Sequence, residues 1–335
     1  MSNNTIALDM GSSYTSIYQV GQNVVLFEPS LIAFQSDDLN KIKAVGLEAK
    51  KLLGRTTDST ELVAPVFDSN VTDEKSASKM LECFLNKITV RKFSARPSVV
   101  MSVPCGVTAQ GLRAYERVLK DAGVNDYAFI ESPVLTAIGL NVTMTNASPA
   151  FIVDIGGGTT EIAAVSLDGI ICGVTVNIGG LTLDSMLMTH LKEKFQLKIG
   201  SLTAENILQN VCSLIVGDTT SMVVHGQSVS TGRPDSILLS AQDVLDPLKI
   251  FFDKIFQVTS MVLAKLPAEV SADIRRNGVY FSGGLSKIEG LEEYFRQTMG
   301  MRTNISPDAQ VATVLGGGVV AENKQLLKKL RINKV

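Results

Sequence analysis

The chain has 335 residues and a formal net charge of −2, because 31 basic side chains oppose 33 acidic ones. This balance, without a long basic stripe, argues against nucleic acid as the main partner. Apolar residues make up 45% of the sequence, but no run reaches the roughly 18 uninterrupted apolar residues that a membrane span requires. No secretory signal precedes the first strand, so we expect a cytoplasmic protein. The length predicts two domains or one large bilobed unit.

The cysteines and histidines offer no metal or disulfide framework. The four cysteines lie far apart and form no C-x-x-C pair, and the two histidines have no partner in a ligand-like spacing. We therefore expect buried thiols and ordinary histidines.

The first predicted element is a hairpin near the N-terminus. Residues 5–20 comprise an apolar strand, Asp9, an apolar residue, Gly11, a turn rich in hydroxyl groups and a second strand. Two further strands are predicted over 23–34, separated by a break at Pro29.

Two helices and a basic loop follow. Apolar positions at helical spacing predict a short helix over 45–55 and a longer one over 72–88. The segment 87–97 mixes basic residues with exposed-looking apolar ones, Val90 and Phe93. That mixture suits contact with an anionic membrane surface. A solvated loop with both apolar side chains tucked into the core is the other interpretation.

A buried strand over 98–104 and a helix capped by Thr108 continue the chain. Another strand then leads to Glu131 and Ser132, followed by Pro133, which suits the first turn of a helix. Polar groups at a helix N-terminus can hold a water molecule or an anion. Glu131 and Ser132 are therefore candidate site residues.

The second half opens with the most informative stretch, Asp154-Ile-Gly-Gly-Gly-Thr-Thr-Glu161, which lies between two apolar runs. This pattern predicts the tight turn of a hairpin in a buried sheet. The glycines allow backbone angles closed to other residues and let N–H groups converge on a phosphate. Asp154 could hold a divalent cation against the same phosphates, usually through water. A hairpin that merely needs glycine is the alternative.

The two hairpins share one plan. Asp9 and Asp154 each follow an apolar strand, and each precedes an apolar residue, a glycine, a short turn and a second strand. The copies lie roughly one domain length apart. We therefore expect two similar domains, each presenting a phosphate-binding hairpin to one nucleotide between them.

The next elements alternate helices with polar segments. A strand, a glycine turn and a helix are predicted over 174–195, and another helix follows with Ser201 or Thr203 as its cap. The hydroxyl-rich segment 217–234 is expected to contain strands and turns, and 241–266 to form one long amphipathic helix.

The C-terminal part contains two more glycine clusters. Residues 278–286 repeat the step from strand to glycine turn, and the triplet 316–318 is expected to interrupt the last apolar helix. The basic tail over 328–334 is predicted to be a solvated helix end.

Together these motifs resemble the actin-like ATPase superfamily, and within it the MreB family of bacterial actins. The resemblance covers about residues 5–320. The matching stretches stand in family order: Glu28-Pro-Ser30, Gly54-Arg55, Arg96-Pro97, Val103-Pro104, Asp154 to Glu161, Ile178-Gly-Gly180, Thr203-Ala-Glu205 and Ser282-Gly-Gly284. Glycine turns alone would not separate this family from sugar kinases or heat-shock chaperone ATPases, whereas the whole set does.

The resemblance implies an α/β protein with the actin-like ATPase fold, in which two lobes of four subdomains surround a central nucleotide cleft. The lobes would span 1–146 and 147–335, with small subdomains inserted at about 33–70 and 184–240. Proteins of this family bind ATP with Mg²⁺ in the cleft and assemble head to tail into filaments.

The resemblance also implies site residues. Asp9 and Asp154 would stand on the metal side, and Glu131, Ser132 and Asp154 are the catalytic candidates. The implied nucleotide contacts are, on the phosphate side, Asp9, Gly11, Ser12, Ser13, Tyr14, Thr15, Gly156, Gly157, Gly158 and Thr159, and on the adenosine side Glu205, Asn206, Ile207, Leu208, Gly283, Gly284, Leu285 and Ser286.

Departures from the family pattern mark a divergent member. Ser132 stands where the family has the second Glu of Glu-Glu-Pro, the residue taken to position the attacking water, and a serine is a poor base. Leu208 replaces a basic residue, and Leu285 replaces a glycine of the adenosine-side turn. Tyr14 occupies a position where a small polar residue is common. The resemblance thus implies a weak ATPase, while Ser132 counts against hydrolysis.

Three functions fit these observations. The first is an ATP-binding filament at the inner face of the cell membrane, which helps to organise cell-wall synthesis and cell shape. Its partners would be further copies of itself, cell-wall synthesis and shape proteins, and a membrane surface contacted through Val90 and Phe93. The second is a hydrolysis-deficient nucleotide-binding paralogue that regulates another filament, for which Ser132 is the support. The third is a small-molecule kinase, for which the sequence offers no extra acidic motif.

Overall fold

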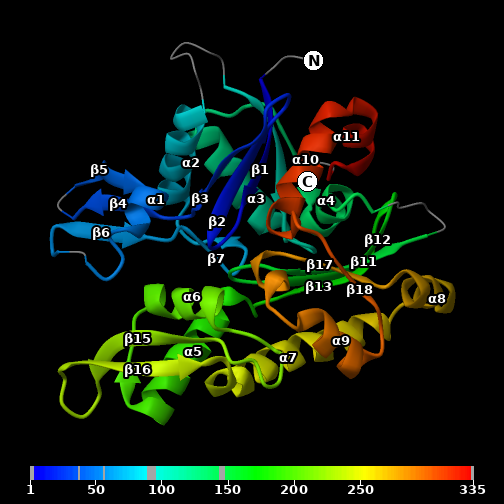
Figure 1. Cartoon of the computed structure of the whole chain (residues 1–335). Helices are drawn as coiled ribbons and strands as arrows, with labels where there is room; N and C mark the ends of the chain where they lie inside the picture. The colour runs from blue at the N-terminus through cyan, green and yellow to red at the C-terminus, as the bar shows by residue number, and fades with distance from the viewer. Residues whose placement is uncertain (1–3, 37, 56, 89–95, 143–147, 333–335) are drawn as a thin grey trace.

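The computed structural model describes residues 4–36, 38–55, 57–88, 96–142 and 148–332. These residues form two five-stranded sheets, smaller sheets at their margins, and helices on both faces of the large sheets (Figure 1). The boundary predicted after residue 146 lies outside the described residues, as do Val90 and Phe93, so the division into 1–146 and 147–335 stays a prediction.

The first large sheet contains the N-terminal hairpin. Its strand order is β10–β9–β1–β2–β3, with β1 and β2 antiparallel and β1 and β9 parallel. Its central strands are apolar runs because both faces of the sheet are covered. The strands are β1 (Thr5–Met10), β2 (Tyr14–Gln19), β3 (Asn23–Pro29), β9 (Ser98–Val103) and β10 (Tyr127–Glu131).

The second large sheet repeats this plan around the Gly-Gly-Gly hairpin. Its order is β13–β12–β11–β17–β18, again with an antiparallel hairpin followed by parallel pairing of the first hairpin strand. The expected repeat is therefore present in strand topology as well as in sequence. The strands are β11 (Ala150–Ile155), β12 (Thr160–Ser166), β13 (Gly169–Val176), β17 (Val279–Ser282) and β18 (Thr303–Ile305).

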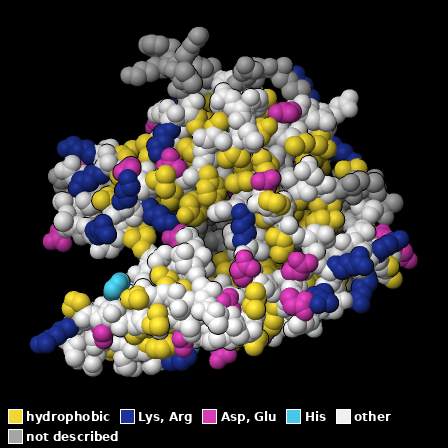
Figure 2. Space-filling model, viewed as in Figure 1, with side chains coloured by type: hydrophobic (Ala, Val, Ile, Leu, Met, Phe, Trp, Pro, Cys, Tyr) yellow, Lys and Arg dark blue, Asp and Glu magenta, His cyan; other side chains and the backbone are white. Residues whose placement is uncertain are grey.

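Smaller sheets extend from each half of the molecule. One has the order β5–β4–β6 and carries α1, and another has the order β14–β15–β16. Both lie toward the left of Figure 1, and Figure 2 shows an open gap in the surface between them. Their strands, with the short pair β7–β8, are β4 (Ile32–Gln35), β5 (Asp38–Val45), β6 (Thr60–Val63), β7 (Val66–Phe67), β8 (Asn70–Val71), β14 (Leu197–Lys198), β15 (Ser221–Ser228) and β16 (Pro234–Ser240).

The helices pack in three layers around the two large sheets. Helices α2 and α3 cover the outer face of the first sheet, α4 and α10 lie between the sheets, and α5, α7 and α9 cover the second. The α-helices are α1 (Leu47–Lys50), α2 (Glu74–Ile88), α3 (Ala109–Asp121), α4 (Ser132–Gly139), α5 (Gly180–Phe195), α6 (Ser201–Asn210), α7 (Leu245–Leu263), α8 (Ala268–Asn277), α9 (Leu291–Met299), α10 (Ala312–Glu322) and α11 (Lys324–Leu330). Three short 3₁₀ turns are η1 (Ala241–Asp243), η2 (Gly284–Lys287) and η3 (Ala309–Val311).

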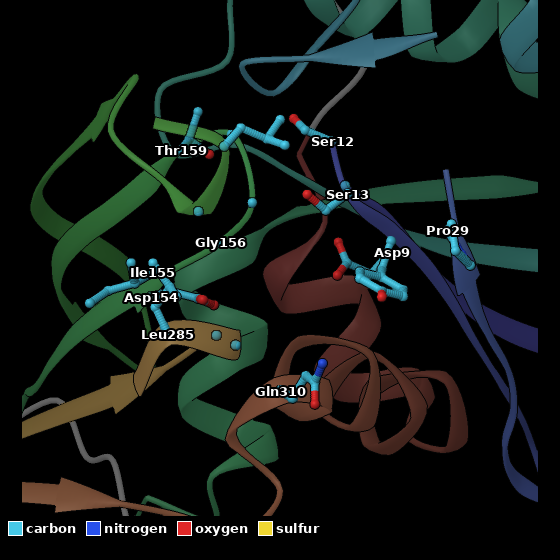
Figure 3. Close-up of a pocket in the computed structure, with 18 of the residues that line it drawn as sticks. Asp9, Ser12, Ser13, Pro29, Asp154, Ile155, Gly156, Thr159, Leu285 and Gln310 are labelled. Atoms are coloured by element: carbon cyan, nitrogen blue, oxygen red, sulfur yellow. The ribbon is translucent and has the colours of Figure 1, made fainter. Parts of the chain in front are cut away.

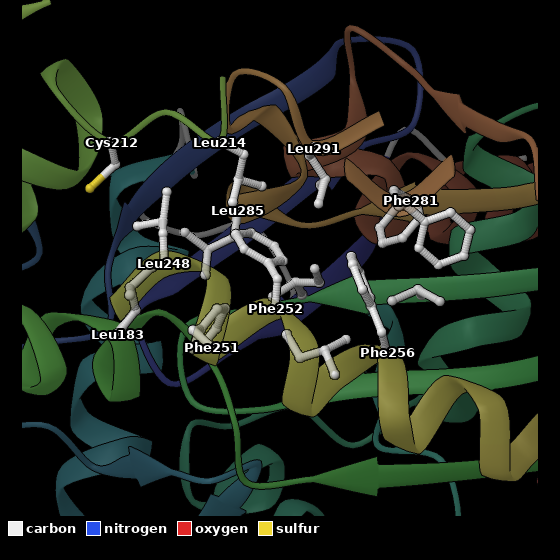
Figure 4. Packing of buried hydrophobic residues seen from close by; sticks show 14 of the residues in the cluster. Leu183, Cys212, Leu214, Leu248, Phe251, Phe252, Phe256, Phe281, Leu285 and Leu291 are labelled. Carbon is white, nitrogen blue, oxygen red and sulfur yellow. The ribbon is translucent and has the colours of Figure 1, made fainter. Parts of the chain in front are cut away.

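Aromatic packing fixes α7 and α9 on the second sheet (Figure 4). The Phe295 ring packs edge to face on both Phe256 and Phe281, with ring centroids 5.0 Å apart in each pair. All three side chains are almost fully buried. Burial of each phenylalanine contributes about 2 kcal/mol, so this cluster anchors the framework on which the second hairpin stands.

The prediction for the glycine triplet 316–318 was wrong, because α10 runs through it without a break. The glycines serve close packing instead. A Cβ added at Gly316 would lie 1.8 Å from the Leu135 carbonyl oxygen, and one added at Gly139 would lie 1.8 Å from the Ala312 carbonyl oxygen. Helices α4 and α10 therefore touch backbone to backbone between the two sheets.

Two helix starts also differ from the prediction. Helix α6 begins at Ser201, so Gly200 is its N-cap and neither Ser201 nor Thr203 caps it with a side chain. The Gly200 carbonyl accepts the first N–H groups directly. The helix predicted over 241–266 is shorter, because η1 and an Asp243–Ser240 capping box precede α7. Within the described residues, no helix combines the length and apolarity needed to cross a membrane.

Candidate nucleotide site

A cavity of about 710 Å³ lies between the two large sheets, and both glycine hairpins line it. Its size falls in the range of small-molecule sites. Figure 3 shows the Asp9 and Asp154 carboxylates on opposite sides of this cavity, both pointing into it. The structure thus brings together the two aspartates that the sequence singled out.

The two hairpin turns have matching backbone geometry. Gly11 N–H donates to the Tyr14 carbonyl at 3.0 Å, and Gly156 N–H donates to the Thr159 carbonyl at 2.9 Å. A Cβ at either glycine would lie 3.1 Å from the same carbonyl oxygen, which favours glycine at both positions. The repeat noted in the sequence therefore extends to individual hydrogen bonds.

The tips of the hairpins touch each other. A Cβ added at Gly157 would lie 2.0 Å from Ser13 Oγ, and one added at Gly158 would lie 2.5 Å from Ser12 Oγ. Because only glycine leaves room for the opposing serines, contact across the cavity explains the second and third glycines of the triplet. The alternative was a hairpin that needs glycine only for its own backbone angles. Gly156, Gly157 and Gly158 all lack positive φ, so their backbone angles do not require glycine.

Two neighbouring stretches donate hydrogen bonds to the hairpin turns. Ser30 Oγ donates to the Gly11 carbonyl at 2.6 Å, and its N–H donates to the Ser13 carbonyl. On the other side, the first N–H groups of α5 donate to the carbonyls of Gly156 and Gly157. The Glu-Pro-Ser and Ile-Gly-Gly stretches therefore fix the hairpins in place.

Asp9 and Asp154 are half-buried carboxylates that accept hydrogen bonds from hydroxyl groups. Ser102 Oγ donates to Asp9 Oδ1 at 2.6 Å, and Thr136 Oγ1 donates to Asp154 Oδ2 at 3.0 Å. Burial raises the pKa of Asp9, and burial together with repulsion from Asp9 raises the pKa of Asp154 to about 6. The charged forms of both aspartates are therefore disfavoured, and a nearby cation would stabilise them.

Glu161 is a third carboxylate in the cavity. It lies directly across from Asp154 in the β11–β12 pairing, and its Oε1 accepts from the Cys105 N–H at 3.0 Å. Burial, followed by repulsion from Asp154, raises its pKa to about 8. In the sequence, Glu161 only marks the end of the hairpin motif, and nothing there predicts its place in the cavity.

The donor set fits Mg²⁺ held jointly with a phosphate. No group of three or more His, Cys, Asp or Glu side chains within the described residues could hold a metal ion by itself. Magnesium commonly takes one or two carboxylates and completes its octahedron with waters and phosphate oxygens. Asp9 and Asp154 supply such carboxylates, and a cation bound beside them would lower their raised pKa values.

The catalytic candidates at the start of α4 point in different directions. Ser132 lines the cavity, and its Oγ donates to the Val103 carbonyl at 2.9 Å. Glu131 does not line the cavity, because its Oε1 accepts from the Gly106 N–H at 2.9 Å. Of the two, only Ser132 lines the cavity.

The adenosine-side candidates divide in the same way. Glu205, Leu208, Gly283, Gly284 and Leu285 line the cavity. Three adenosine-side candidates lie outside its lining: Asn206, which bonds Asn210, Ile207, which is in the core, and Ser286, which bonds the Gly283 carbonyl. On the phosphate side, Thr15 also lies outside the lining, because its Oγ1 bonds Ser30. These side chains support the site without facing the cavity.

Several lining residues carried no signal in the sequence. Ser69, from the β7–β8 turn, bonds Thr159 Oγ1 at 2.6 Å and so joins the two halves. Lys50 and Asp184 also line the cavity. Isolated polar residues on a short turn or a helix match no motif, and only the tertiary fold brings them to the glycine hairpins.

A repeated five-stranded sheet, with one glycine hairpin from each half facing a shared cavity, defines an actin-like fold. Solved structures agree. MreB5 of Spiroplasma citri bound to AMPPNP is 26% identical with a TM-score of 0.91, covering 98% of both chains. The same protein bound to ADP is 27% identical with a TM-score of 0.90, covering 97% of both chains.

The chain belongs to the MreB/Mbl family, since the family model described as MreB/Mbl protein matches residues 3–329. The cell shape-determining protein MreB of Pasteurella multocida is 33% identical over 326 residues, which are 95% of this chain and 93% of that protein. The resemblance expected from the motifs is confirmed, and the family assignment favours a cytoskeletal role over a small-molecule kinase.

Proposed function

We propose that this protein binds ATP with Mg²⁺ and assembles into filaments that act in cell shape determination and in the spatial organisation of cell-wall synthesis. The observation that carries the nucleotide part is the meeting of two matched glycine hairpins, each preceded by a half-buried aspartate, at one cavity. Family membership supports the cellular part, because its curated relatives are named cell shape-determining proteins.

The charge of the cavity supports a cation as part of the ligand. Six acidic side chains line it, whereas Lys50 and Lys287 are the cationic ones among the described lining residues. A triphosphate alone would be repelled by this surface, and a divalent cation removes the conflict. Bound at Asp9 and Asp154, Mg²⁺ would offset charge on the phosphates, while backbone N–H groups of the hairpins bind the phosphate oxygens.

For hydrolysis, we propose that this chain is a weak ATPase. Ser132 faces the cavity and can hold a water molecule, but it lacks the basicity to take a proton. Glu131 is engaged by the Gly106 N–H, so it would have to leave that bond to act. Turnover should therefore be slow and separable from nucleotide binding.

The test is sedimentation of purified protein with Mg-ATP, Mg-ADP and no nucleotide, with phosphate release measured in parallel. We expect pelleting that depends on Mg-ATP and a slow release of phosphate. Protein that stays in the supernatant at high concentration with every nucleotide would contradict assembly.

Association with a membrane is a separate part of the proposal. We propose that the basic segment with Val90 and Phe93 contacts the inner face of the cell membrane, because it mixes basic with apolar side chains. Flotation with anionic liposomes should recover the wild type and lose the double variant Val90→Ser, Phe93→Ser. Equal recovery of both proteins would remove this segment from the account.

A second candidate function is a nucleotide-binding paralogue that regulates another filament without turnover. The specific observation is Ser132, whose hydroxyl is already used by the Val103 carbonyl. Under this proposal Ser132→Glu raises phosphate release by about tenfold or more, the scale of one positioned acid–base group. A wild type that already hydrolyses ATP as fast as the variant would rule this candidate out.

A further inference from the structure

Three side chains from opposite halves of the molecule meet across the nucleotide cavity. Lys50 of α1 lies 2.7 Å from Glu205 Oε1 of α6, and its Nζ also donates to the Tyr14 hydroxyl at 3.0 Å. The Tyr14 hydroxyl in turn donates to Glu205 Oε1 at 3.3 Å. All three residues line the cavity. In Figure 1, α1 belongs to the upper half and α6 to the lower half.

The cluster is held firmly on the side of the first hairpin. The Tyr14 ring stacks on Phe27, with centroids 4.7 Å apart and planes within 4° of parallel. The Lys50 ammonium lies 5.2 Å from the centroid of the same ring. The Lys50 and Glu205 side chains are only 23% and 25% exposed, so solvent screens this pair less than an ordinary surface pair.

Burial acts to lower the pKa of the Lys50 ammonium, but its hydrogen bonds with Glu205 and Tyr14 outweigh burial and raise the pKa. Lysine therefore keeps its charge, and both bonds to Lys50 are charge-assisted. Such hydrogen bonds are stronger than those between neutral groups. They therefore hold the two sides of the cavity together at this point, in addition to packing contacts.

Tyr14 links this cluster to the phosphate turn. Its backbone carbonyl closes the first hairpin by accepting from Gly11 N–H, while its side chain reaches Glu205 on the other half. A ligand that moves the first hairpin must therefore also move the Tyr14 hydroxyl. Glu205 is already engaged by Tyr14, Lys50 and Gln209, so a ligand hydroxyl would have to compete for it.

We propose that Tyr14, Lys50 and Glu205 form a latch across the cavity, which opens for a nucleotide to enter or leave and recloses over the bound nucleotide. The proposal rests on the nucleotide binding proposed above. Lys50 and Tyr14 are then positioning residues, which act through Glu205 and through closure of the two halves. The latch sets the rate of nucleotide exchange and contributes little to affinity, because it is closed both before and after binding.

The experiment is stopped-flow measurement of association and dissociation of a fluorescent ADP analogue with Mg²⁺, using the full chain. The variants are Lys50→Met, which removes the ammonium and keeps the stem, and Tyr14→Phe, which keeps the ring stacked on Phe27 and removes the hydroxyl. Lys51→Met is the matched control, because Lys51 is the next residue, is 68% exposed and pairs only with Glu48 among the described residues.

We expect Lys50→Met and Tyr14→Phe to raise both rate constants by about threefold or more and by similar factors, the scale of a lost charge-assisted hydrogen bond. Lys51→Met should leave both rate constants within about twofold of the wild type. Tyr14→Phe keeps the latch testable should Lys50→Met fail to fold.

Two results overturn the latch. One is an increase of less than about threefold in both variants, and the other is faster dissociation without faster association, which would make Lys50 a nucleotide contact. If the wild type binds no nucleotide, the proposed function fails and the latch with it. Nucleotide binding with unchanged exchange rates refutes the latch alone.

Discussion

Asp184 is a carboxylate in the cavity lining whose charged form is disfavoured by its surroundings. Its Oδ1 is buried and has no hydrogen-bond partner among the described residues. Burial, and then repulsion from Glu205, raises the pKa of Asp184 to about 7, although Lys50 acts in the opposite direction. Since the folded-state pKa lies above the ordinary value of 3.8, folding favours the protonated acid.

Asp184→Asn should therefore stabilise the nucleotide-free protein at high pH. The wild type loses this part of its stability as pH rises from about 4 to about 7, whereas the neutral amide has no proton to lose. We expect the variant to be about 1–2 kcal/mol more stable at pH 8, a figure reduced because part of the side chain faces solvent. Denaturant unfolding at pH 4.5 and pH 8 measures the difference.

At pH 4.5 the difference should fall to about a quarter of that at pH 8, because only part of the loss has occurred there. An Asp184→Asn variant that is less stable than the wild type at pH 8 would contradict the raised pKa, since it would show a carboxylate that the fold favours in its charged form.

Single residues were the hardest part of the site to predict. Asp9 and Asp154 could be found because each adjoins a glycine turn that is readable in the sequence. Lys50 and Asp184 lie on helices with no motif, and Glu161 gained its role only from the pairing of β11 with β12. Glu131, by contrast, was a reasonable candidate that a backbone N–H turns away from the cavity.

At the scale of elements, glycine clusters with similar sequences allow different neighbours to come close. In the second hairpin, Gly157 and Gly158 make room for serines of the first hairpin. In α10, Gly316 makes room for the backbone of α4. Local sequence predicts that glycine is needed, but the partner that comes close is set by the fold, which is why the interruption of α10 was wrongly predicted.

Gly157→Ala should weaken nucleotide binding. The added Cβ would lie 2.0 Å from Ser13 Oγ and 2.5 Å from Ser13 Cβ, so the two hairpins must separate. We expect the affinity for Mg-ATP to fall by about tenfold or more, because the N–H groups of both turns no longer converge on one ligand. Gly200→Ala is the control, since a Cβ there meets nothing within 4 Å. Titration calorimetry compares the two, and equal affinities would show that hairpin contact is unimportant.

Gly316→Ala should destabilise the whole fold. Its Cβ would lie 1.8 Å from a carbonyl oxygen of α4, a backbone atom that cannot rotate away. We expect a loss of about 2–3 kcal/mol in the free energy of unfolding, as in other overpacked interiors. Val319→Ala on the exposed face of the same helix should change it by less than about 0.5 kcal/mol. Thermal unfolding of both variants measures these changes. A Gly316→Ala variant as stable as the wild type would mean that α4 and α10 can move apart at little cost in free energy.

At the scale of the whole molecule, two large sheets with the same strand order face one another across α4, α10 and the nucleotide cavity. The sequence predicted this architecture well, since the repeat of strand, aspartate, glycine turn and strand is local and the family motifs extend along the chain. It could not predict the contacts between halves, such as Ser69 with Thr159, because each partner belongs to a different part of the sequence.

The central claim is that both hairpins bind the same Mg-nucleotide. Calorimetric titration of Mg-ATP into the wild type, Asp9→Asn and Asp154→Asn tests it most directly. We predict one site per chain in the wild type and a loss of about tenfold or more in affinity in each variant, because each removes one carboxylate from the metal side. A wild type without affinity for Mg-ATP, or a variant of either aspartate that binds as tightly as the wild type, would contradict the account.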